Sequence, residues 1–236
     1  ITIMHANNEV GTIQPIEEIS MLARQRKIVF HTDGAQSVGK IPTDVGTLGV
    51  DLLSIAGHKL YAPKGVGALY VRDGSVLNKF MVGAGQEMGR RAGTENVLEI
   101  VGLGMACELA ARDLERNSSH MRAMRDMLQQ GLSELLTDIR VNGHREKRLP
   151  NTLSVSFRGL EANRILEEIG LDVAASAGAA CHAETVEISH VLEAMRVPVD
   201  WAKGTLRFTT GRMTTQEEIL RAIKVVADAV KRLRSQ

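Results

Sequence analysis

Residues 50–59 read VDLLSIAGHK, and the rest of the chain is organised around the end of this stretch. The apolar run from Val50 to Ile55 is short and is followed by glycine, which is typical of a buried strand. A lysine just past such a strand is costly unless a site uses it, because desolvation favours the neutral amine. Lys59 is therefore a candidate nucleophile able to form a Schiff base. The alternative is a lysine that simply reaches water, as most do.

Two earlier strands support the first interpretation. Ile1–Met4 and Lys27–Thr32 are predicted strands, and a helix is predicted to start near Ile16 between them. Strand, helix, strand, connection and strand together predict a parallel α/β sheet, in which ligands sit at the carboxyl ends of the strands. Polar residues follow all three predicted strand ends, and we expect them to converge: Asn8, Asp33 with Gln36, and His58 with Lys59.

A glycine-rich loop follows a further predicted strand, Ala68–Val71. This loop, residues 83–96, holds two arginines and Thr94, so it would suit either phosphate contact or a plain surface loop. Helix is predicted from Val97 to Leu114 and again from His120 to Leu136, with a break at residues 117–119. We place the domain boundary at this break, which gives an incomplete large cofactor-binding domain over 1–117 and a small C-terminal domain over 118–236.

The second domain is predicted to be α+β. Its expected strands are Ile139–Val141, a half-buried Thr152–Phe157, Asp172–Ala175 and Thr205–Phe208, and helices are expected over Glu161–Ile169 and Glu187–Met195. Small residues precede Cys181, which predicts a flexible, accessible loop there. The last helix has a capping box at Thr215 and Glu218 and one apolar stripe, which predicts a core face.

Composition narrows the functional classes. The 236 residues are 44% hydrophobic and 24% charged, with a net charge of +1, so nothing favours nucleic acid or an anionic membrane surface. Aromatic residues make up 3%, which argues against a base-stacking platform. Two distant cysteines without zinc-ligand spacing predict a reducing, cytoplasmic setting and no metal site. The sequence begins inside a predicted strand without an initiator methionine, so we expect it to be part of a longer protein.

Pyridoxal 5′-phosphate is the cofactor whose needs these strand ends match. Lys59 would hold its aldehyde, and a carboxylate must keep its pyridine nitrogen protonated so that the ring can accept electrons. Asp33, at a neighbouring strand end, is suited to that ion pair. Gln36 would donate to the ring hydroxyl, and Asn8 would do the same or hold a substrate carboxylate. As single residues, each has an ordinary alternative, for example a turn aspartate before Gly34.

Several spaced segments resemble the signatures of the cysteine desulfurases, a group that includes the selenocysteine lyases and has the aspartate-aminotransferase-like fold, fold type I of the pyridoxal phosphate enzymes. The resemblance covers essentially the whole chain in order. The segments are Asn7–Gly11, His31–Lys40, Gly57–Lys59, Arg91–Asn96, Ser176–His182 and Leu206–Phe208.

The resemblance implies a role for each matching position. Lys59 would be the Schiff-base lysine, Asp33 the pyridinium partner and Gln36 the ring-hydroxyl donor. His58 would lie near the phosphate and assist proton transfer. Thr94 would reach the cofactor phosphate of a partner subunit in a homodimer. Asn8 would contact substrate and ring, and Arg207 would clamp the substrate carboxylate.

Cys181 would be the nucleophile that takes the sulfur of L-cysteine and becomes a persulfide. Its small neighbours and His182 fit an accessible thiol, and nearby positive charge would lower the thiol pKa. Its ordinary alternative is a buried small hydrophobic residue. Cys107 lies among apolar helical residues and is expected to be core. His5 and His31 flank strand ends and could line the site, but a core or supporting role is expected of them.

Two departures from the family pattern stand out. Ala56 replaces a hydroxyl residue that binds the cofactor phosphate in many desulfurases. The phosphate-cradling loop and the histidine that stacks on the ring are expected before Ile1.

The sequence therefore predicts a pyridoxal phosphate-dependent cysteine desulfurase. It would give L-alanine and pass the persulfide to an acceptor such as an iron–sulfur scaffold or a tRNA-thiolation protein. Three alternatives stay open: a selenocysteine lyase, a non-catalytic fragment that serves in dimerisation or scaffold binding, and a thiol enzyme without cofactor.

Overall fold

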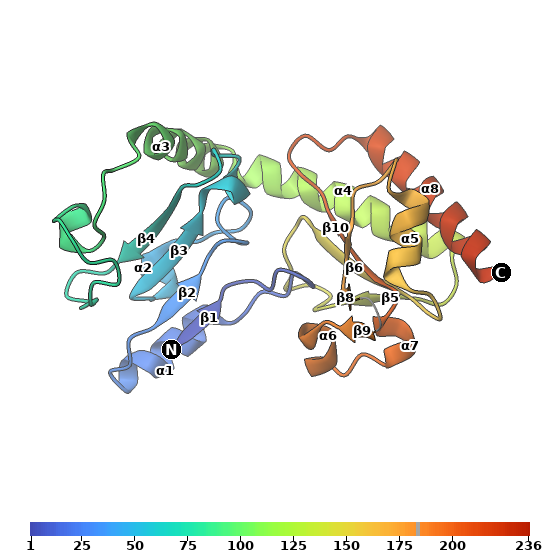
Figure 1. Cartoon of the computed structure of the whole chain (residues 1–236), viewed down its shortest axis with the longest axis horizontal. Coiled ribbons are helices and arrows are strands. Elements are labelled where there is room, and N and C mark those ends of the chain that lie inside the picture. Colours follow the sequence, from blue (N-terminus) through green and yellow to red (C-terminus); the bar gives the residue numbers. More distant parts are fainter. Residues whose placement is uncertain (183–184) are drawn as a thin grey trace. The chain divides into compact units, whose positions relative to one another are not determined.

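The computed structural model describes residues 1–182 and 185–236, without the side chains of residues 179–182 and 185–187 (Figure 1). The chain divides into two compact units. The first comprises residues 1–6 and 14–114, and the second comprises residues 7–13 and 115–236. Among the described residues, no helix combines the length and apolar character needed to cross a membrane.

The first unit contains one four-stranded sheet in the order β1-β2-β3-β4. β1, β2 and β3 run parallel, as predicted, and β4 is antiparallel to β3. The elements are β1 (Thr2–Met4), α1 (Ile16–Gln25), β2 (His31–Asp33), α2 (Val45–Leu48), β3 (Leu52–Ala56), the 3₁₀ turn η1 (Gly57–Leu60), β4 (Gly67–Val71), the 3₁₀ turn η2 (Glu87–Gly89) and α3 (Val97–Arg112).

The apolar stretches predicted for this unit form its core. Phe30, Val50 and Leu53 are buried and pack with residues of α1 and α2. β2 starts at His31, later than the predicted Lys27, because Lys27 has a positive φ of 55° in the turn that follows α1. Leu60 of η1 packs against Leu103 and Ala106 of α3 in a second cluster.

The second unit is α+β, with a four-stranded sheet in the order β5-β6-β10-β7 and a separate hairpin β8–β9. Its elements are α4 (Leu114–Leu135), β5 (Ile139–Asn142), β6 (Thr152–Phe157), α5 (Ala162–Ile169), β7 (Ser176–Ala177), β8 (Ala179–His182), β9 (Thr185–Ile188), α6 (His190–Ala194), α7 (Val199–Ala202), β10 (Thr205–Thr209) and α8 (Gln216–Arg234).

Helices α4, α5 and α8 cover one face of this sheet (Figure 1). The predicted capping box of α8 is present, and its predicted apolar stripe is buried in the core of the unit. The helix break predicted at residues 117–119 is wrong, because α4 runs through it from Leu114 to Leu135. Its buried face, with Met121, Leu128 and Leu132, outweighs the weak helix propensity of three polar residues.

The prediction that β6 is half-buried is also wrong, because all six of its residues are buried. Ser156 hydrogen-bonds Thr205 at 2.7 Å and accepts from Asn142 at 2.8 Å, so its polar face is satisfied without water. Residues 7–13 and α7 contact this face, and a Cβ at Gly11 would lie 3.0 Å from the Thr152 Cβ.

Two further predictions fail around Cys181. Residues 172–175 form no strand, and β7 begins only at Ser176. The helix predicted from Glu187 is replaced by β9 to Ile188, and α6 begins at His190 with Ser189 as its N-cap. Cys181 therefore lies in the strand β8 of a hairpin rather than in a loop.

Candidate active site

The first unit brings the carboxyl ends of β2 and β3 to one edge of its sheet. Asp33 is the last residue of β2, and its register partner on β3 is Ser54. β3 continues two residues further to Ala56, about 7 Å at the usual rise of a strand. η1 follows directly and contains His58 and Lys59. The acid and the lysine therefore occupy neighbouring strand ends, as the sequence predicts.

Asp33 is oriented by the turn that it starts. Its Oδ1 accepts from the Ala35 N–H at 2.8 Å, and the Gly34 N–H donates to the Ser54 carbonyl at 3.0 Å. A Cβ at Gly34 would lie 3.1 Å from that carbonyl oxygen, so the turn packs closely on β3. In the described part of the chain the other oxygen, Oδ2, has no hydrogen-bond partner. Gln36 is half-buried in the same turn.

The expectation that Lys59 is desolvated is wrong. η1 buries Gly57 against Val66 and Leu60 against the helix α3, and it leaves His58 and Lys59 exposed. Lys40, which the sequence analysis did not consider, donates from Nζ to the Lys59 carbonyl at 3.4 Å. Burial and the nearby charge of Lys59 lower the pKa of Lys40 to about 8.

Two histidines lie beside Asp33, in the core and supporting positions expected of them. His5 is 4% exposed, its N–H donates to the Asp33 carbonyl at 2.9 Å, and its Nδ1 is buried without a partner among the described residues. Burial lowers the pKa of His5, which favours the neutral imidazole at pH 7. His31 connects Thr2 and Ser54 through hydrogen bonds of 2.6 and 2.7 Å. Strand alternation puts it on the face of Asp33.

Thr94 is exposed in the glycine-rich loop of the first unit. Near it, the Arg91 guanidinium donates to the Gly93 carbonyl at 3.2 Å, and the Gln86 side chain accepts from the Gly93 N–H at 3.2 Å. The loop is therefore shaped by its own hydrogen bonds and leaves the Thr94 hydroxyl to the surface.

The second unit holds Asn8 and Arg207 together. Arg207 Nη1 donates to the Asn8 carbonyl at 2.8 Å, and Nη2 donates to Ser176 Oγ at 3.1 Å. Its Nε is buried and has no partner in the described part of the protein. An arginine fixed by two contacts keeps further N–H donors, Nε among them, and is suited to a ligand carboxylate.

Cys181 and Cys107 occupy unlike places. Cys181 lies in β8, paired with Val186 of β9, and its side chain lies outside the described structure. Cys107 is half-buried in α3, where burial raises the pKa of its thiol. Of the two, Cys107 has the environment of an inert core thiol.

The predicted site residues thus form two groups. Asp33, Gln36, His58, Lys59 and Thr94 belong to the first unit, and Asn8, Cys181 and Arg207 belong to the second. His5 and His31 lie beside the first group, as the sequence analysis allowed, and Lys40 joins it without having been considered. The alternation of His31 with Asp33 was the one signal that pointed to a shared face.

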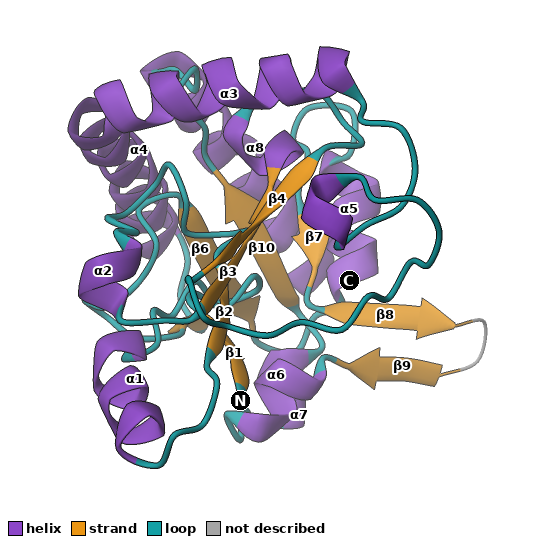
Figure 2. Cartoon of the chain, turned by 90° about the vertical axis from the view of Figure 1, so that its left-hand side faces the viewer, coloured by secondary structure: helices purple, strands orange, loops and turns teal. Residues whose placement is uncertain are grey.

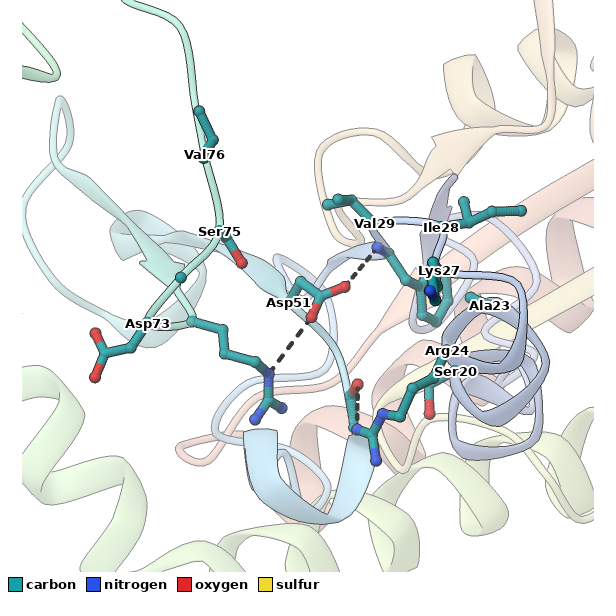
Figure 3. Close-up of a pocket in the computed structure, with 14 residues that line it drawn as sticks. Ser20, Ala23, Arg24, Lys27, Ile28, Val29, Asp51, Asp73, Ser75 and Val76 are labelled. Carbon is teal, nitrogen blue, oxygen red and sulfur yellow. Dashed lines mark hydrogen bonds and ion pairs between the residues drawn. The ribbon is translucent and has the colours of Figure 1, made fainter.

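A pocket of about 550 Å³ lies elsewhere, at the amino ends of β2 and β3 (Figure 3). It contains none of the predicted site residues. Three of its charged side chains already serve the fold: Asp51 accepts from the Phe30 N–H at 2.9 Å and pairs with Arg72 at 3.5 Å, and Arg24 donates to the Gly49 carbonyl at 3.2 Å. In an α/β sheet this is the edge opposite to the usual ligand edge.

Comparison with known proteins identifies the family of the chain. Residues 1–221 match the family model described as aminotransferase class-V. The chain is 45% identical over 236 residues to the cysteine desulfurase IscS of Dictyoglomus turgidum, and 44% identical to the cysteine desulfurase NifS of Azotobacter vinelandii. All of this chain is aligned, with 60% and 59% of those relatives.

Solved structures of a NifS-like protein and of SspA are also similar to this chain. A NifS-like protein aligns with 98% of this chain and 60% of its own, at 36% identity and a TM-score of 0.89. The structure of SspA in complex with cysteine aligns with 91% of this chain and 59% of its own, at 36% identity and a TM-score of 0.71. The chain thus spans about three fifths of the relatives it matches.

The chain belongs to the aminotransferase class-V family. The predicted fold, the α/β transferase fold of type I pyridoxal phosphate enzymes, is confirmed by the structural matches. Pyridoxal 5′-phosphate is the cofactor of this family, as predicted. The residues present suit it, because the sheet edge offers an unpartnered carboxylate oxygen on Asp33, an exposed amine on Lys59 and a buried imidazole nitrogen on His5.

Proposed function

We propose that this chain is part of a cysteine desulfurase, which converts L-cysteine to L-alanine and leaves the sulfur as a persulfide on Cys181. The observation that carries the proposal is the placement of Asp33 and Lys59 at the ends of neighbouring strands of one sheet. The match of the whole chain to several cysteine desulfurases at 44–46% identity supports the substrate. The similar structure of SspA holds cysteine, which supports the same substrate.

The residues of the first unit would hold the cofactor and move a proton. Pyridoxal phosphate, when bound, supplies an electron sink for the substrate carbanion. The Lys59 amine is exposed and would take the cofactor aldehyde, then remove the substrate α-proton once released. Asp33 Oδ2 would hold the proton of the ring nitrogen, and Gln36 would donate to the ring hydroxyl. His58 would lie near the phosphate, where it assists proton transfer.

The residues of the second unit would hold the substrate and receive its sulfur. The partnerless Arg207 Nε gives the guanidinium a donor for the substrate carboxylate, with Asn8 beside it. The Cys181 thiolate would attack the cysteine sulfur, so that an S–S bond forms as the C–S bond breaks and its electron pair goes to the substrate carbon. The β-carbon would then be protonated, and Lys59 would return a proton to the α-carbon, which gives L-alanine.

The proposal extends to a homodimer in the cytoplasm. Val97, Leu98 and Val101 of α3 are 65%, 81% and 66% exposed, and α3 directly follows the loop that carries Thr94. A second copy that covers this apolar face would receive Thr94 near its cofactor phosphate. The persulfide would then pass to an acceptor protein such as an iron–sulfur scaffold.

Replacing Cys181 by Ala tests the chemistry. The variant should lose sulfur release from L-cysteine by about 10²-fold or more while it still binds the cofactor, because only the sulfur acceptor is removed. Release is measured as sulfide in the presence of a thiol reductant, and cofactor binding by absorbance. Cys107→Ala is the matched control and should keep full activity. Unimpaired sulfide release by Cys181→Ala would contradict the role.

A further inference from the structure

Segment 7–10 forms a rigid turn in the second unit. Asn7 Oδ1 accepts from the N–H groups of Glu9 and Val10, both at 2.9 Å. The Asn7 N–H donates to the Thr12 carbonyl at 2.9 Å, and the Gly11 N–H donates to the Asn7 carbonyl at 3.1 Å. The turn therefore presents Asn8 and Glu9, two consecutive residues, in fixed directions.

The Asn8 backbone is linked through Arg207 to Ser176, just before the chain enters the β8–β9 hairpin that contains Cys181. The Asn8 carbonyl accepts from Arg207, and the same guanidinium donates to Ser176 Oγ. Ser176 begins β7, and only Gly178 separates β7 from β8. We call Gly178 and Ser189, the residues at which the chain enters and leaves the hairpin, the foot of the hairpin. The Gly178 N–H donates to the Thr205 carbonyl at 2.7 Å, which fixes this side of the foot to β10.

The Glu9 side chain contacts Ser189, the residue at which the chain leaves the β8–β9 hairpin. Ser189 follows β9, and its hydroxyl donates to Glu9 Oε2 at 2.5 Å. Ser189 Oγ also accepts from the Val191 N–H at 3.1 Å and so caps α6. The Ser189 N–H donates to the Gly178 carbonyl at 3.1 Å, which joins the two sides of the foot. A hydrogen bond to a carboxylate is about twice as strong as one between neutral groups.

The foot has to orient the hairpin, because β8 and β9 form a two-stranded sheet of their own. An isolated two-stranded hairpin is marginally stable in water, so its own ladder cannot fix its direction. In Figure 2 the hairpin extends away from the sheet, with α6 beside its foot. What holds residues 178 and 189 therefore sets where the strand with Cys181 lies.

We propose that Glu9 and Ser189 are positioning residues for Cys181: the Glu9 carboxylate and the Ser189 hydroxyl anchor the foot of the β8–β9 hairpin on the turn that also supports Arg207. This inference rests on the proposed function. It assigns Glu9 a role in the sulfur-transfer step that is separate from substrate binding. Arg207 is held by the Asn8 backbone. Loss of the Glu9 side chain should therefore disturb the position of Cys181 more than it disturbs the contact of Arg207 with the substrate carboxylate.

The experiment compares Glu9→Ala, Glu9→Gln and a control, Glu193→Ala, an exposed residue of α6 next to the same foot. The first readout is amide hydrogen exchange at Gly178, Ser189 and Val191, followed by NMR, with amides of the first unit as reference. The second readout is the kcat and the KM for L-cysteine. A glutamine can still accept from Ser189, so it should rescue what alanine loses.

In Glu9→Ala we expect the amide hydrogens at the foot to exchange about tenfold faster, because a hydrogen bond to a charged group typically stabilises by about this factor or more. Amide exchange in the first unit should be unchanged. Its kcat should fall about tenfold while the KM stays within twofold, and Glu9→Gln and Glu193→Ala should resemble the wild type. Unchanged exchange at the foot, a Gln variant as impaired as Ala, or a KM that rises as much as kcat falls would overturn the proposal. The exchange readout does not depend on activity. Failure of the desulfurase proposal can therefore be distinguished from failure of the Glu9–Ser189 proposal.

Discussion

At the scale of single residues, Lys40 combines a half-buried amine with a neighbouring lysine. It donates to the Lys59 carbonyl, and desolvation together with the charge of Lys59 lowers its pKa from the ordinary 10.5 to about 8. A lysine in this position costs stability while it is charged. Its conformation is sustained by Gly39, whose φ is 75° and whose missing Cβ makes room for Leu60.

The stability of the protein should therefore depend on pH through Lys40. Between pH 8 and 10.5 the unfolded chain holds a proton that the folded chain has lost, so the free energy of unfolding rises with pH. The gain is at most about 3 kcal/mol and is reduced by solvent screening. Lys40→Met should remove this rise, as measured by urea denaturation across the pH window.

Lys64→Met is the control for that experiment, because Lys64 is an exposed lysine near η1. It should keep the pH dependence of the wild type. Equal pH slopes in the wild type and Lys40→Met would contradict the assigned environment of Lys40.

At the scale of elements, the helix α3 is apolar on two sides. One side, with Leu103 and Ala106, packs against η1, and the other leaves Val97, Leu98 and Val101 exposed. Exposed apolar side chains that lie together on one helix are typical of an interaction surface. In the proposed homodimer, a second copy of the chain would bury this face of α3.

Val101→Glu should therefore shift the protein from dimer to monomer, since a buried unpaired carboxylate is strongly unfavourable at an interface. Sedimentation equilibrium measures the dissociation constant, which should rise by about 10²-fold or more. Glu108→Gln, an exposed position on the same helix, should leave it unchanged. A Val101→Glu variant that dimerises as tightly as the wild type would exclude this face.

Elements with a strong local signal could be predicted from the sequence, and those decided by distant contacts could not. The capping box of α8 and the apolar runs of β3 and β6 are local. The burial of the serines of β6 depends on Asn142 and Thr205, which are remote in sequence. Residues 187–195 have apolar positions at helical spacing, yet Ile188 belongs to β9. Ser189, a good N-cap, was the overlooked signal of where α6 begins.

The candidate site divides in the same way. Asp33 and Lys59 were predictable because carboxyl ends of parallel strands always share an edge. Lys40 and the Glu9–Ser189 contact join residues 19 and 180 positions apart, and no pattern in the sequence indicates such pairs. The exposure of Lys59 was only one of two alternatives at the level of the sequence, because periodicity does not reveal that a 3₁₀ turn follows β3.

At the scale of the whole molecule, each of the two compact units has its own core. Gly204 is a sensitive point of the second unit. A Cβ there would lie far inside van der Waals contact with the Phe157 carbonyl oxygen and 2.9 Å from that of Leu160. The contacts are with backbone, which cannot move aside cheaply.

Gly204→Ala should accordingly destabilise the second unit by about 1–3 kcal/mol. Amide exchange monitored by mass spectrometry should accelerate in α5 and β10 and stay unchanged in α1 and β3. Gly85→Ala, at a glycine with open space around it, is the control and should have no effect. Equal acceleration in both units would show that they unfold together.

The central claim is that Lys59 carries the aldehyde cofactor. The most direct test is to incubate the protein with pyridoxal 5′-phosphate, reduce with borohydride and locate the phosphopyridoxyl group by peptide mass spectrometry. The account predicts a single labelled lysine, Lys59, with labelling lost in Lys59→Ala and weakened in Asp33→Ala. A label on Lys40 or Lys64, or one spread over the surface lysines, would contradict it.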